Sequence, residues 1–237
     1  MKKNNLVVVT GGSGRFGKVL KKKNYKNFLF PNKAELNILN IISIEKYLRK
    51  IKPKKLIHLA GLSRPLDQHE KNIQKSISLN ILGTCNLVMV CEKLNIKIIY
   101  FSTSYVYPGR KGNYKENSPI LPSSNYAWSK LGGECAVHMY KNSLILRVCM
   151  TEKPFIHKAA FSDIKLNFIF HEEVAQILIK VLDQVGILNI GGPILSPYQF
   201  AKKYNPNIKK ILSSSLKGLK YPKNLSMNIS KLKKIIN

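Results

Sequence analysis

The sequence predicts an α/β fold with a doubly wound parallel sheet and a small C-terminal lobe. Short apolar runs alternate with longer amphipathic runs, an order typical of a parallel sheet with crossover helices. Strands are expected at residues 6–10, 26–30, 55–60, 96–102, 143–149 and 187–190. Helices are expected at residues 14–22, 43–51, 69–93, 123–141, 171–184 and 197–204. The alternation loosens after residue 150, so we expect a core domain at 1–150 and a dependent lobe at 151–237 packed on it.

The first expected strand ends in a glycine-rich turn. Leu6–Val9 is an apolar run fit for a buried strand, and it leads into the sequence TGGSGRFG at 10–17. Gly11 can form the sharp turn, Gly14 lets the backbone approach a pyrophosphate, and Gly17 lets the next helix pack closely on the sheet. Free amides at the start of that helix attract an anion. A strand before this motif and an amphipathic helix after it indicate a dinucleotide-binding loop.

The segment after the second expected strand bears on the choice of dinucleotide. Proteins of this design that select NAD carry an acidic ribose-binding residue there. This chain has Pro31-Asn32-Lys33 instead, and a lysine favours the 2′-phosphate of NADPH. One more exposed lysine is the alternative interpretation. We therefore expect NADPH, with NADH as the other candidate. Ser43 is expected to cap the helix that follows.

Three hydroxyl residues, Ser102, Thr103 and Ser104, follow the fourth expected strand. Ligands of open α/β sheets lie beyond the carboxyl ends of the strands, where such hydroxyls can bind a substrate oxygen. A Ser/Thr turn that satisfies its own backbone is the alternative. Their position about twenty residues before the next motif favours a functional role.

The segment Tyr126-Ala-Trp-Ser-Lys130 places a phenol and an ammonium four residues apart, on the same face of a helix. A nearby cation favours the phenolate and lowers the pKa of a tyrosine from its usual value of about 10. Such a tyrosine can exchange a proton with a carbonyl oxygen near neutral pH. A surface helix with a half-buried ring is the alternative, but the glycine motif and the hydroxyl residues upstream argue against it.

Together these motifs resemble the extended short-chain dehydrogenase/reductase superfamily, whose core is a Rossmann-type fold. Within it, the chain is most similar to the dTDP-4-dehydrorhamnose reductase group, and the UDP-rhamnose epimerase/reductases share much of the pattern. The resemblance spans nearly the whole chain. The motifs that carry it are TGGSGRFG (10–17), HLAG (58–61), SLNILGTCNL (78–87), FSTSYVYPG (101–109) and NYAWSKLGGE (125–134), with Tyr114, Glu116 and Pro119.

The resemblance implies an NAD(P)H-dependent reductase of a nucleotide-linked 4-keto-6-deoxy sugar, in deoxysugar and surface polysaccharide biosynthesis. Thr103 would orient the ketone, Tyr126 would donate the proton, and Lys130 would lower the pKa of Tyr126 and bind the nicotinamide ribose. The implied cofactor-binding residues are Gly11, Gly14, Arg15, Phe16, Gly17, Lys33, Asn37, Ile38, Ala60, Gly61, Tyr126 and Lys130. The implied substrate-binding residues are Ser104, Tyr105 and Arg64.

Several other polar residues near these motifs have two interpretations. The resemblance assigns to Asn80 a bend in its helix or a proton relay near Lys130, whereas a surface asparagine is the alternative. For His58 we favour a packed histidine over a catalytic one. Arg147 could reach a phosphate or simply support the core. Beyond Lys130, the helical series continues to Glu134 and His138, where we expect a structural ion pair at most.

The chain also departs from the family pattern. The family often has acidic residues where Ser104 and Asn37 stand and an arginine where Tyr221 stands. The stretch after Arg147-Val148 is shorter than in the family. These differences leave the reductase core in place and leave the identity of the sugar open.

Composition favours a globular, cytoplasmic enzyme. The 237 residues include 40 Lys plus Arg and 12 Asp plus Glu, a net charge of +28. Because the lysines are scattered, we expect no specific nucleic-acid binding, although the positive field would steer anionic nucleotides to the protein. We expect no membrane segment, no signal peptide and no metal site, since no apolar run is long enough and the cysteines lack metal-ligand spacing. A homodimer is an option.

Three other functions fit parts of the sequence. A nucleotide-sugar 4-epimerase or a 4,6-dehydratase would use the same fold, although a dehydratase usually needs an acid directly after Thr103. A non-catalytic NADP-binding regulatory subunit would fit the short C-terminal lobe. A basic nucleic-acid-binding protein would fit the charge.

Overall fold

A six-stranded sheet organises the computed structural model, which describes residues 5–215 and 221–236 of the chain. β1 pairs in parallel with β2 and β3, and β3 pairs in parallel with β4. The predicted α/β fold and its six expected strands are confirmed. The spatial order of the strands is β2 (Phe28–Leu29), β1 (Val7–Thr10), β3 (Lys55–His58), β4 (Lys97–Thr103), β5 (Ser143–Val148) and β9 (Gly186–Ile190).

The order of the strands reverses at β1, between β2 on one side and β3 on the other. Ligands of open parallel sheets bind beyond the carboxyl ends of the strands at such a reversal. Thr10 ends β1 and His58 ends β3, and the two residues pair in register. The glycine loop after β1 and the HLAG turn after β3 therefore leave the sheet side by side.

Two compact groups of residues make up the described chain. Unit 1 holds the described residues within Met1–Ser102, Ser124–Leu146 and Leu182–Ile187. Unit 2 holds those within Thr103–Ser123, Arg147–Val181 and Leu188–Asn237. Both units are discontinuous in sequence, and the expected domain boundary at residue 150 stays a prediction.

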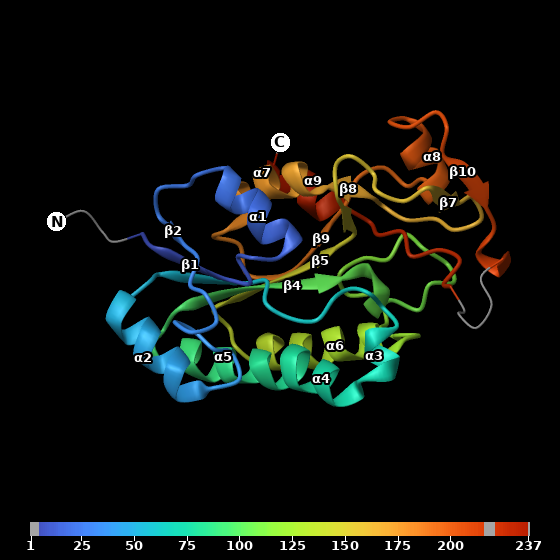
Figure 1. Ribbon diagram of the computed structural model, residues 1–237. Helices are drawn as coiled ribbons and strands as arrows, with labels where there is room; N and C mark the ends of the chain where they lie inside the picture. Colours follow the sequence, from blue (N-terminus) through green and yellow to red (C-terminus); the bar gives the residue numbers. More distant parts are fainter. Residues whose placement is uncertain (1–4, 216–220, 237) are drawn as a thin grey trace. The chain divides into compact units, whose positions relative to one another are not determined.

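The helices of unit 1 cover its strands on both faces. Figure 1 shows α1 on one face of the sheet, and α2, α4, α5 and α6 on the other. On α1, Phe16, Gly17 and Leu20 are buried, whereas Lys21 and Lys22 form the basic last turn. The helices are α1 (Arg15–Lys22), α2 (Ile41–Ile51), α3 (Gln68–Lys71), α4 (Ile73–Ile77), a π-helical turn at Ser78–Leu82, α5 (Gly83–Lys93) and α6 (Asn125–His138).

Two expectations about these helices are wrong. The single helix expected at 69–93 is divided, because Asn72 caps a new helix by accepting the Lys75 N–H and because a π-helical turn surrounds Asn80. Helix α2 is capped by Asn40, whose side chain accepts the N–H of Ser43, so Ser43 is not the N-cap. The side-chain oxygen of an asparagine caps a helix as readily as that of a serine, which is why the sequence alone misplaced the N-cap of α2.

Unit 2 contains short elements in addition to the ends of the central strands. The expected helices are present as α7 (His171–Val181) and α8 (Pro197–Lys202). Two-stranded pairs form between β6 (Met150–Thr151) and β8 (Ile169–Phe170), and between β7 (Ala159–Phe161) and β10 (Lys209–Ile211). These strands were not expected, because two or three residues are too few to show a periodic pattern. Helix α9 (Ser230–Ile236) was not expected either. Buried aromatic residues pack this unit: Phe155, Phe170 and Phe200.

No helix in the described part of the chain is long and apolar enough to cross a membrane. Among residues 5–215 and 221–236, no group of three His, Cys, Asp or Glu side chains could hold a metal ion. Cys85, Cys91 and Cys135 are free thiols, and Cys91 and Cys149 are buried.

Candidate functional site

The glycine loop after β1 is shaped by contacts that leave no room for side chains. Gly11 has a φ of +73°, and a Cβ there would lie 2.5 Å from the Ala60 nitrogen. A Cβ on Gly17 would lie 2.5 Å from the Gly11 carbonyl oxygen. That oxygen also accepts a hydrogen bond from the Gly14 N–H at 3.0 Å. The roles expected for Gly11 and Gly17, a sharp turn and close helix packing, thus have a steric basis.

Gly14 is the N-cap of helix α1, and neither the cap nor the first turn places a negative side chain at the positive end of this helix. Gly14 supplies no capping side chain, and the first turn contains no acidic residue. The loop and the helix start together form a cradle of backbone suited to a phosphate. Arg15 donates a hydrogen bond to the Ser63 hydroxyl at 3.1 Å. Phe16 instead packs in the core, with its ring 5.1 Å from that of Phe101, so its side chain anchors α1.

The residues expected near the adenosine ribose differ in their surroundings. Lys33 is exposed beside a turn in which the Asn32 side chain accepts the N–H groups of Ala34 and Glu35. The Asn37 side chain accepts the Leu39 N–H at 3.1 Å, which occupies its oxygen in a local turn. Ile38 is buried.

Helix α6 carries the expected proton donor and its partner. Ser124 caps the helix, and Tyr126 and Lys130 follow one turn apart, both half-buried. The Lys130 ammonium lies 4.2 Å from the centre of the Tyr100 ring, and the Tyr100 hydroxyl donates to the Lys130 carbonyl at 2.9 Å. Burial lowers the pKa of the Lys130 ammonium to about 7, and the Glu134 carboxylate acts in the opposite direction. The Lys130 ammonium is therefore largely desolvated, and its pKa lies below that of an exposed lysine.

Helix α3 holds the start of α6, a feature that the sequence did not reveal. The Glu70 carboxylate accepts hydrogen bonds from the Asn125 side-chain amide at 2.5 Å and from the Asn125 backbone N–H at 3.2 Å. The ring of His69 meets the ring of Tyr126 edge-on, with centres 5.1 Å apart. His69 is itself buried and bonded to the Ser76 hydroxyl at 2.7 Å. Two neighbouring residues of α3 thus contact two neighbouring residues of α6.

Glu134 forms a hydrogen bond with Ser102, one of the three hydroxyl residues that the sequence suggested as possible contacts of the substrate. The Ser102 hydroxyl donates to the Glu134 carboxylate at 2.5 Å, and both side chains are buried. Ser102 is therefore part of the support beneath α6. His138 ends the helix in an exposed position.

Thr103 and Ser104 belong to unit 2. Both are buried, and the Thr103 hydroxyl accepts the Tyr105 N–H at 3.3 Å. The Ser104 hydroxyl has no hydrogen-bond partner among the described residues. Tyr105 is half-buried, and Arg64, in unit 1, is exposed. That Thr103 meets Tyr126 and Lys130 at one site stays a prediction.

Arg147 supports the interior of unit 2. It is 1% exposed, and its guanidinium donates to the Tyr107 hydroxyl at 2.8 Å and to the Glu116 carbonyl at 3.0 Å. Tyr107 stacks on Tyr114 with ring centres 4.8 Å apart and donates to Asn189 at 2.8 Å. Of the two interpretations of Arg147, these contacts favour a structural role.

Asn80 and His58 are both buried in unit 1, so the interpretation of Asn80 as a surface residue is wrong. Asn80 lies in the π-helical turn, as a residue that bends its helix would. His58 is 2% exposed and lies between the hydroxyls of Thr10 and Thr84. This is the packed histidine that the sequence favoured.

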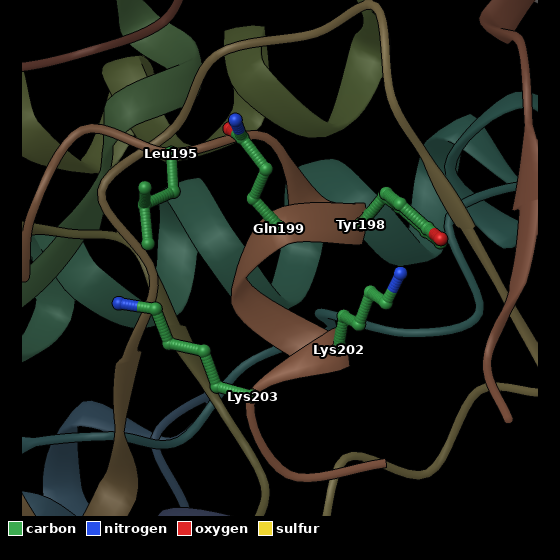
Figure 2. Close-up of a pocket in the computed structure, with 5 residues that line it drawn as sticks. All are labelled: Leu195, Tyr198, Gln199, Lys202 and Lys203. Carbon is green, nitrogen blue, oxygen red and sulfur yellow. The ribbon is translucent and has the colours of Figure 1, made fainter. Parts of the chain in front are cut away.

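Unit 2 also has a pocket of about 410 Å³ beside α8, outside the residues of the predicted site. Lys202 extends its ammonium to 5.6 Å from the centre of the Tyr198 ring. Gln199 closes the capping box of α8 by accepting the Ser196 N–H, so its amide oxygen is already used. Figure 2 shows the lining residues: Leu195, Tyr198, Gln199, Lys202 and Lys203.

Residues 5–152, more than half of the chain, match the family model described as the RmlD substrate binding domain. The chain belongs to this family. The resemblance to dTDP-4-dehydrorhamnose reductases drawn from the motifs is thereby confirmed at the level of the family.

Two kinds of curated relative are similar to this chain. A dTDP-4-dehydrorhamnose reductase from Aggregatibacter actinomycetemcomitans is 30% identical over 198 residues, which cover 80% of this chain and 63% of the relative. Methionine adenosyltransferase 2 subunit beta from Xenopus tropicalis is 29% identical over 152 residues, which cover 60% of this chain and 45% of the relative. The chain thus matches less than two thirds of the length of either relative.

Solved structures share the fold. A dTDP-4-dehydrorhamnose reductase from Bacillus anthracis, in complex with NADP, superposes with a TM-score of 0.87 at 22% identity and covers 97% of this chain and 91% of its own. The Bordetella bronchiseptica enzyme WbmG, in complex with NAD and UDP, gives a TM-score of 0.76 at 16% identity, with coverages of 97% and 87%. At these identities the likeness establishes the fold alone.

Proposed function

We propose that the protein is an NADPH-dependent reductase of a nucleotide-linked 4-keto-6-deoxy sugar, similar to dTDP-4-dehydrorhamnose reductase. The observation that carries this proposal is Tyr126-x-x-x-Lys130 on α6, in the same unit as an open glycine loop, within a chain of this family. A tyrosine one helical turn before a desolvated lysine is suited to protonating a ketone oxygen as it becomes an alkoxide.

The residues present fit a dinucleotide. The glycine loop offers a backbone cradle in which a Cβ at Gly11 or Gly17 would overlap the neighbouring backbone, and α1 adds a positive end with no acidic residue in its first turn. Gly11, Gly14 and Gly17 would hold the pyrophosphate, and Lys33 would lie toward a 2′-phosphate. NADPH, when bound, supplies the hydride that reduces the ketone carbon.

The chain's own residues would supply the proton and the orientation. Tyr126 would donate its phenolic proton to the ketone oxygen, which yields the hydroxyl of the product and leaves a phenolate. Lys130 would stabilise that phenolate by its charge, and Thr103 would hold the ketone oxygen by a hydrogen bond. Solvent would return the proton to Tyr126 after each turnover. Ser104, Tyr105 and Arg64 remain the proposed contacts of the substrate.

The test is a screen of 4-keto-6-deoxy sugar nucleotides carrying dTDP, UDP, GDP or CDP, each with NADPH and with NADH. A reductase consumes one reduced nicotinamide per keto sugar, which the absorbance of the reduced cofactor follows. An epimerase or a dehydratase recycles its cofactor, so conversion of a sugar nucleotide without net NADPH consumption would contradict the proposal.

A second candidate is a non-catalytic, dinucleotide-binding regulatory subunit, and the observation behind it is the similarity to a protein that is named as a subunit, methionine adenosyltransferase 2 subunit beta. It predicts tight NADPH binding with no turnover of any keto sugar. Parallel binding and turnover assays separate the two. We also propose a cytoplasmic location, in keeping with the free thiols of Cys85, Cys91 and Cys135, and a homodimer, which sedimentation of the purified protein would test.

A further inference from the structure

A chain of buried hydrogen bonds starts at the strand that carries the glycine loop. The Thr10 hydroxyl lies 2.9 Å from Nδ1 of His58, and Nε2 of His58 lies 3.0 Å from the Thr84 hydroxyl. The Thr84 hydroxyl donates in turn to the carbonyl oxygen of Asn80 at 2.8 Å. Three elements, β1, β3 and α5, are thereby joined to the π-helical turn.

This series of hydrogen bonds continues from the Asn80 side chain to α6, the helix that carries Tyr126, the proposed proton donor. The amide nitrogen of Asn80 donates to the Ser129 hydroxyl at 2.8 Å, and the Ser129 hydroxyl donates to the carbonyl of Tyr126 at 2.8 Å. Leu62, next to the HLAG turn, holds the Asn80 amide in place by donating to its oxygen at 2.7 Å and accepting from its nitrogen at 2.9 Å. We call the side chains of Thr10, His58, Thr84, Asn80 and Ser129 the polar spine.

The direction of each hydrogen bond follows from what the partners can donate. A carbonyl oxygen only accepts, so the Thr84 hydroxyl spends its single proton on the Asn80 carbonyl. It must therefore accept from Nε2 of His58, which carries the ring proton. Nδ1 of a neutral ring is then an acceptor, and the Thr10 hydroxyl donates to it. Burial lowers the pKa of His58 to about 3, with the charge of Lys130 acting in the same direction, so the ring is neutral at pH 7.

The spine is shielded from water along its length. Its side chains are 0–4% exposed, from Thr84 at 0% to Ser129 at 4%. Two glycines allow its close packing: a Cβ on Gly61 would lie 2.7 Å from the Asn80 side-chain oxygen, and a Cβ on Gly133 would lie 2.6 Å from the Asn80 carbonyl and 3.0 Å from the Thr84 hydroxyl. Buried hydrogen bonds with no water to replace them fix the elements that they join.

We infer that His58, protonated at Nε2, is the central joint of the polar spine, which fixes the glycine loop relative to Tyr126. His58 is a positioning residue in this scheme, since it would act through the hydroxyls of Thr10 and Thr84 that it contacts. The spine would keep the bound dinucleotide and the phenol in register, and a small misplacement of such groups lowers turnover strongly. This function of the spine rests on the proposed function, whereas the protonation of His58 does not.

Nitrogen-15 NMR of the histidine rings tests the protonation of His58 directly. The chain has 5 histidines, and a His58→Gln variant assigns the His58 signals by difference. We expect a neutral ring protonated at Nε2 at pH 7 and still at pH 5. A proton on Nδ1, or a doubly protonated ring at either pH, would overturn the inference, whatever the protein proves to catalyse.

Amide hydrogen exchange with NADP⁺ tests the coupling without a sugar substrate. Thr84→Val removes the hydroxyl and nearly preserves the shape of the side chain, and Thr84→Ser is its matched control because it keeps the hydroxyl. In the wild type and in Thr84→Ser, NADP⁺ should protect both the glycine loop and the first turns of α6. In Thr84→Val it should protect the loop alone. Equal protection of α6 in all three proteins would overturn the coupling.

Turnover gives the functional counterpart. If the keto sugar is reduced, Thr84→Val should lower kcat about tenfold while KM and the NADP⁺ Kd stay within about twofold, and Thr84→Ser should restore kcat. Wild-type kcat in Thr84→Val would overturn the positioning role. If Thr84→Val does not fold, Thr10→Val and Thr10→Ser give the same comparison at the other end of the spine. Failure of wild-type protein to bind NADP⁺ or to reduce any sugar would instead count against the proposed function.

Discussion

At the scale of single residues, the surroundings of Lys130 and Tyr126 are built by different neighbours. Lys130 lies over the Tyr100 ring and is held by the hydroxyl of that tyrosine. Tyr126 is approached edge-on by His69, and its carbonyl is fixed by Ser129. The spacing of the pair was evident in the sequence. Tyr100 and His69 were not evident as neighbours, because they come from a strand and a helix that only the fold brings next to α6.

Tyr126→Phe isolates the proposed proton donor. The substitution removes only the hydroxyl and keeps the ring that packs against His69. We expect turnover of the keto sugar to fall by about 10²–10⁴, the usual contribution of a general acid, while dinucleotide affinity is unchanged. Steady-state kinetics and a binding titration measure the two quantities. A Phe variant with wild-type kcat would remove Tyr126 from the mechanism.

The pKa of Lys130 predicts a pH dependence. The ammonium is charged below about pH 7 and loses its charge as the pH rises through that value. Since the charge is needed to stabilise the Tyr126 phenolate, kcat/KM for NADPH, which reports the enzyme before the dinucleotide binds, should decline above about pH 7. Lys130→Met should be slow at every pH and lack this decline. A wild-type profile that stays flat to pH 9 would contradict the assignment.

At the scale of elements, short pieces of helix determine how α6 is held. The sequence predicted one helix over 69–93 and located Asn80 within it, but the structure divides that stretch into α3, α4, a π-helical turn and α5. Asn72 caps α4 and Asn80 lies in the π-helical turn, and asparagine is also common in ordinary loops. The strands and amphipathic helices of the core were predictable because their apolar period is long enough to read. The two-residue strands β6 and β8 were not.

Substitution of Glu70 removes the hydrogen bonds by which α3 holds the start of α6. Glu70→Ala removes the acceptor of both Asn125 hydrogen bonds, so α6 loses a restraint directly before Tyr126. We expect kcat to fall about tenfold with a smaller change in KM, and Glu70→Gln, which keeps one acceptor oxygen, to recover part of it. Asp67→Ala is the control, since Asp67, the N-cap residue of α3, pairs with Lys71 at the end of the same helix. An equal loss of kcat in the Asp67 variant would show that α3 acts only through its stability.

The glycine loop allows a matched pair of substitutions. Gly11 and Gly186 both have positive φ, at +73° and +84°, but a Cβ at Gly11 meets backbone at 2.5 Å whereas nothing lies within 4 Å at Gly186. Each change to Ala should cost about 1–2 kcal/mol from the left-handed backbone. Gly11→Ala should add about 1–3 kcal/mol from overlap and abolish dinucleotide binding. Chemical denaturation and a binding titration measure both effects. Normal NADPH affinity in Gly11→Ala would contradict the cradle.

At the scale of the whole molecule, the sequence predicts the effect of the net charge of +28, whereas only the structure shows that the chain forms two compact units. The scattered lysines predict steering of anionic nucleotides by a field that salt should screen, rather than selective nucleic-acid binding. The Rossmann-type core was predictable because each motif is local. The meeting of Thr103, in unit 2, with Tyr126, in unit 1, depends on contacts far apart in sequence and stays a prediction.

The most direct measurement of the central claim is the fate of the hydride. The protein should be incubated with a 4-keto-6-deoxy sugar nucleotide and NADPH in which both hydrogens at C4 of the nicotinamide are deuterium, and the product should be examined by NMR. We expect one deuterium at C4 of the product sugar for each NADPH oxidised. A sugar that is converted without taking up deuterium, or NADPH that is oxidised without labelling C4, would contradict the account.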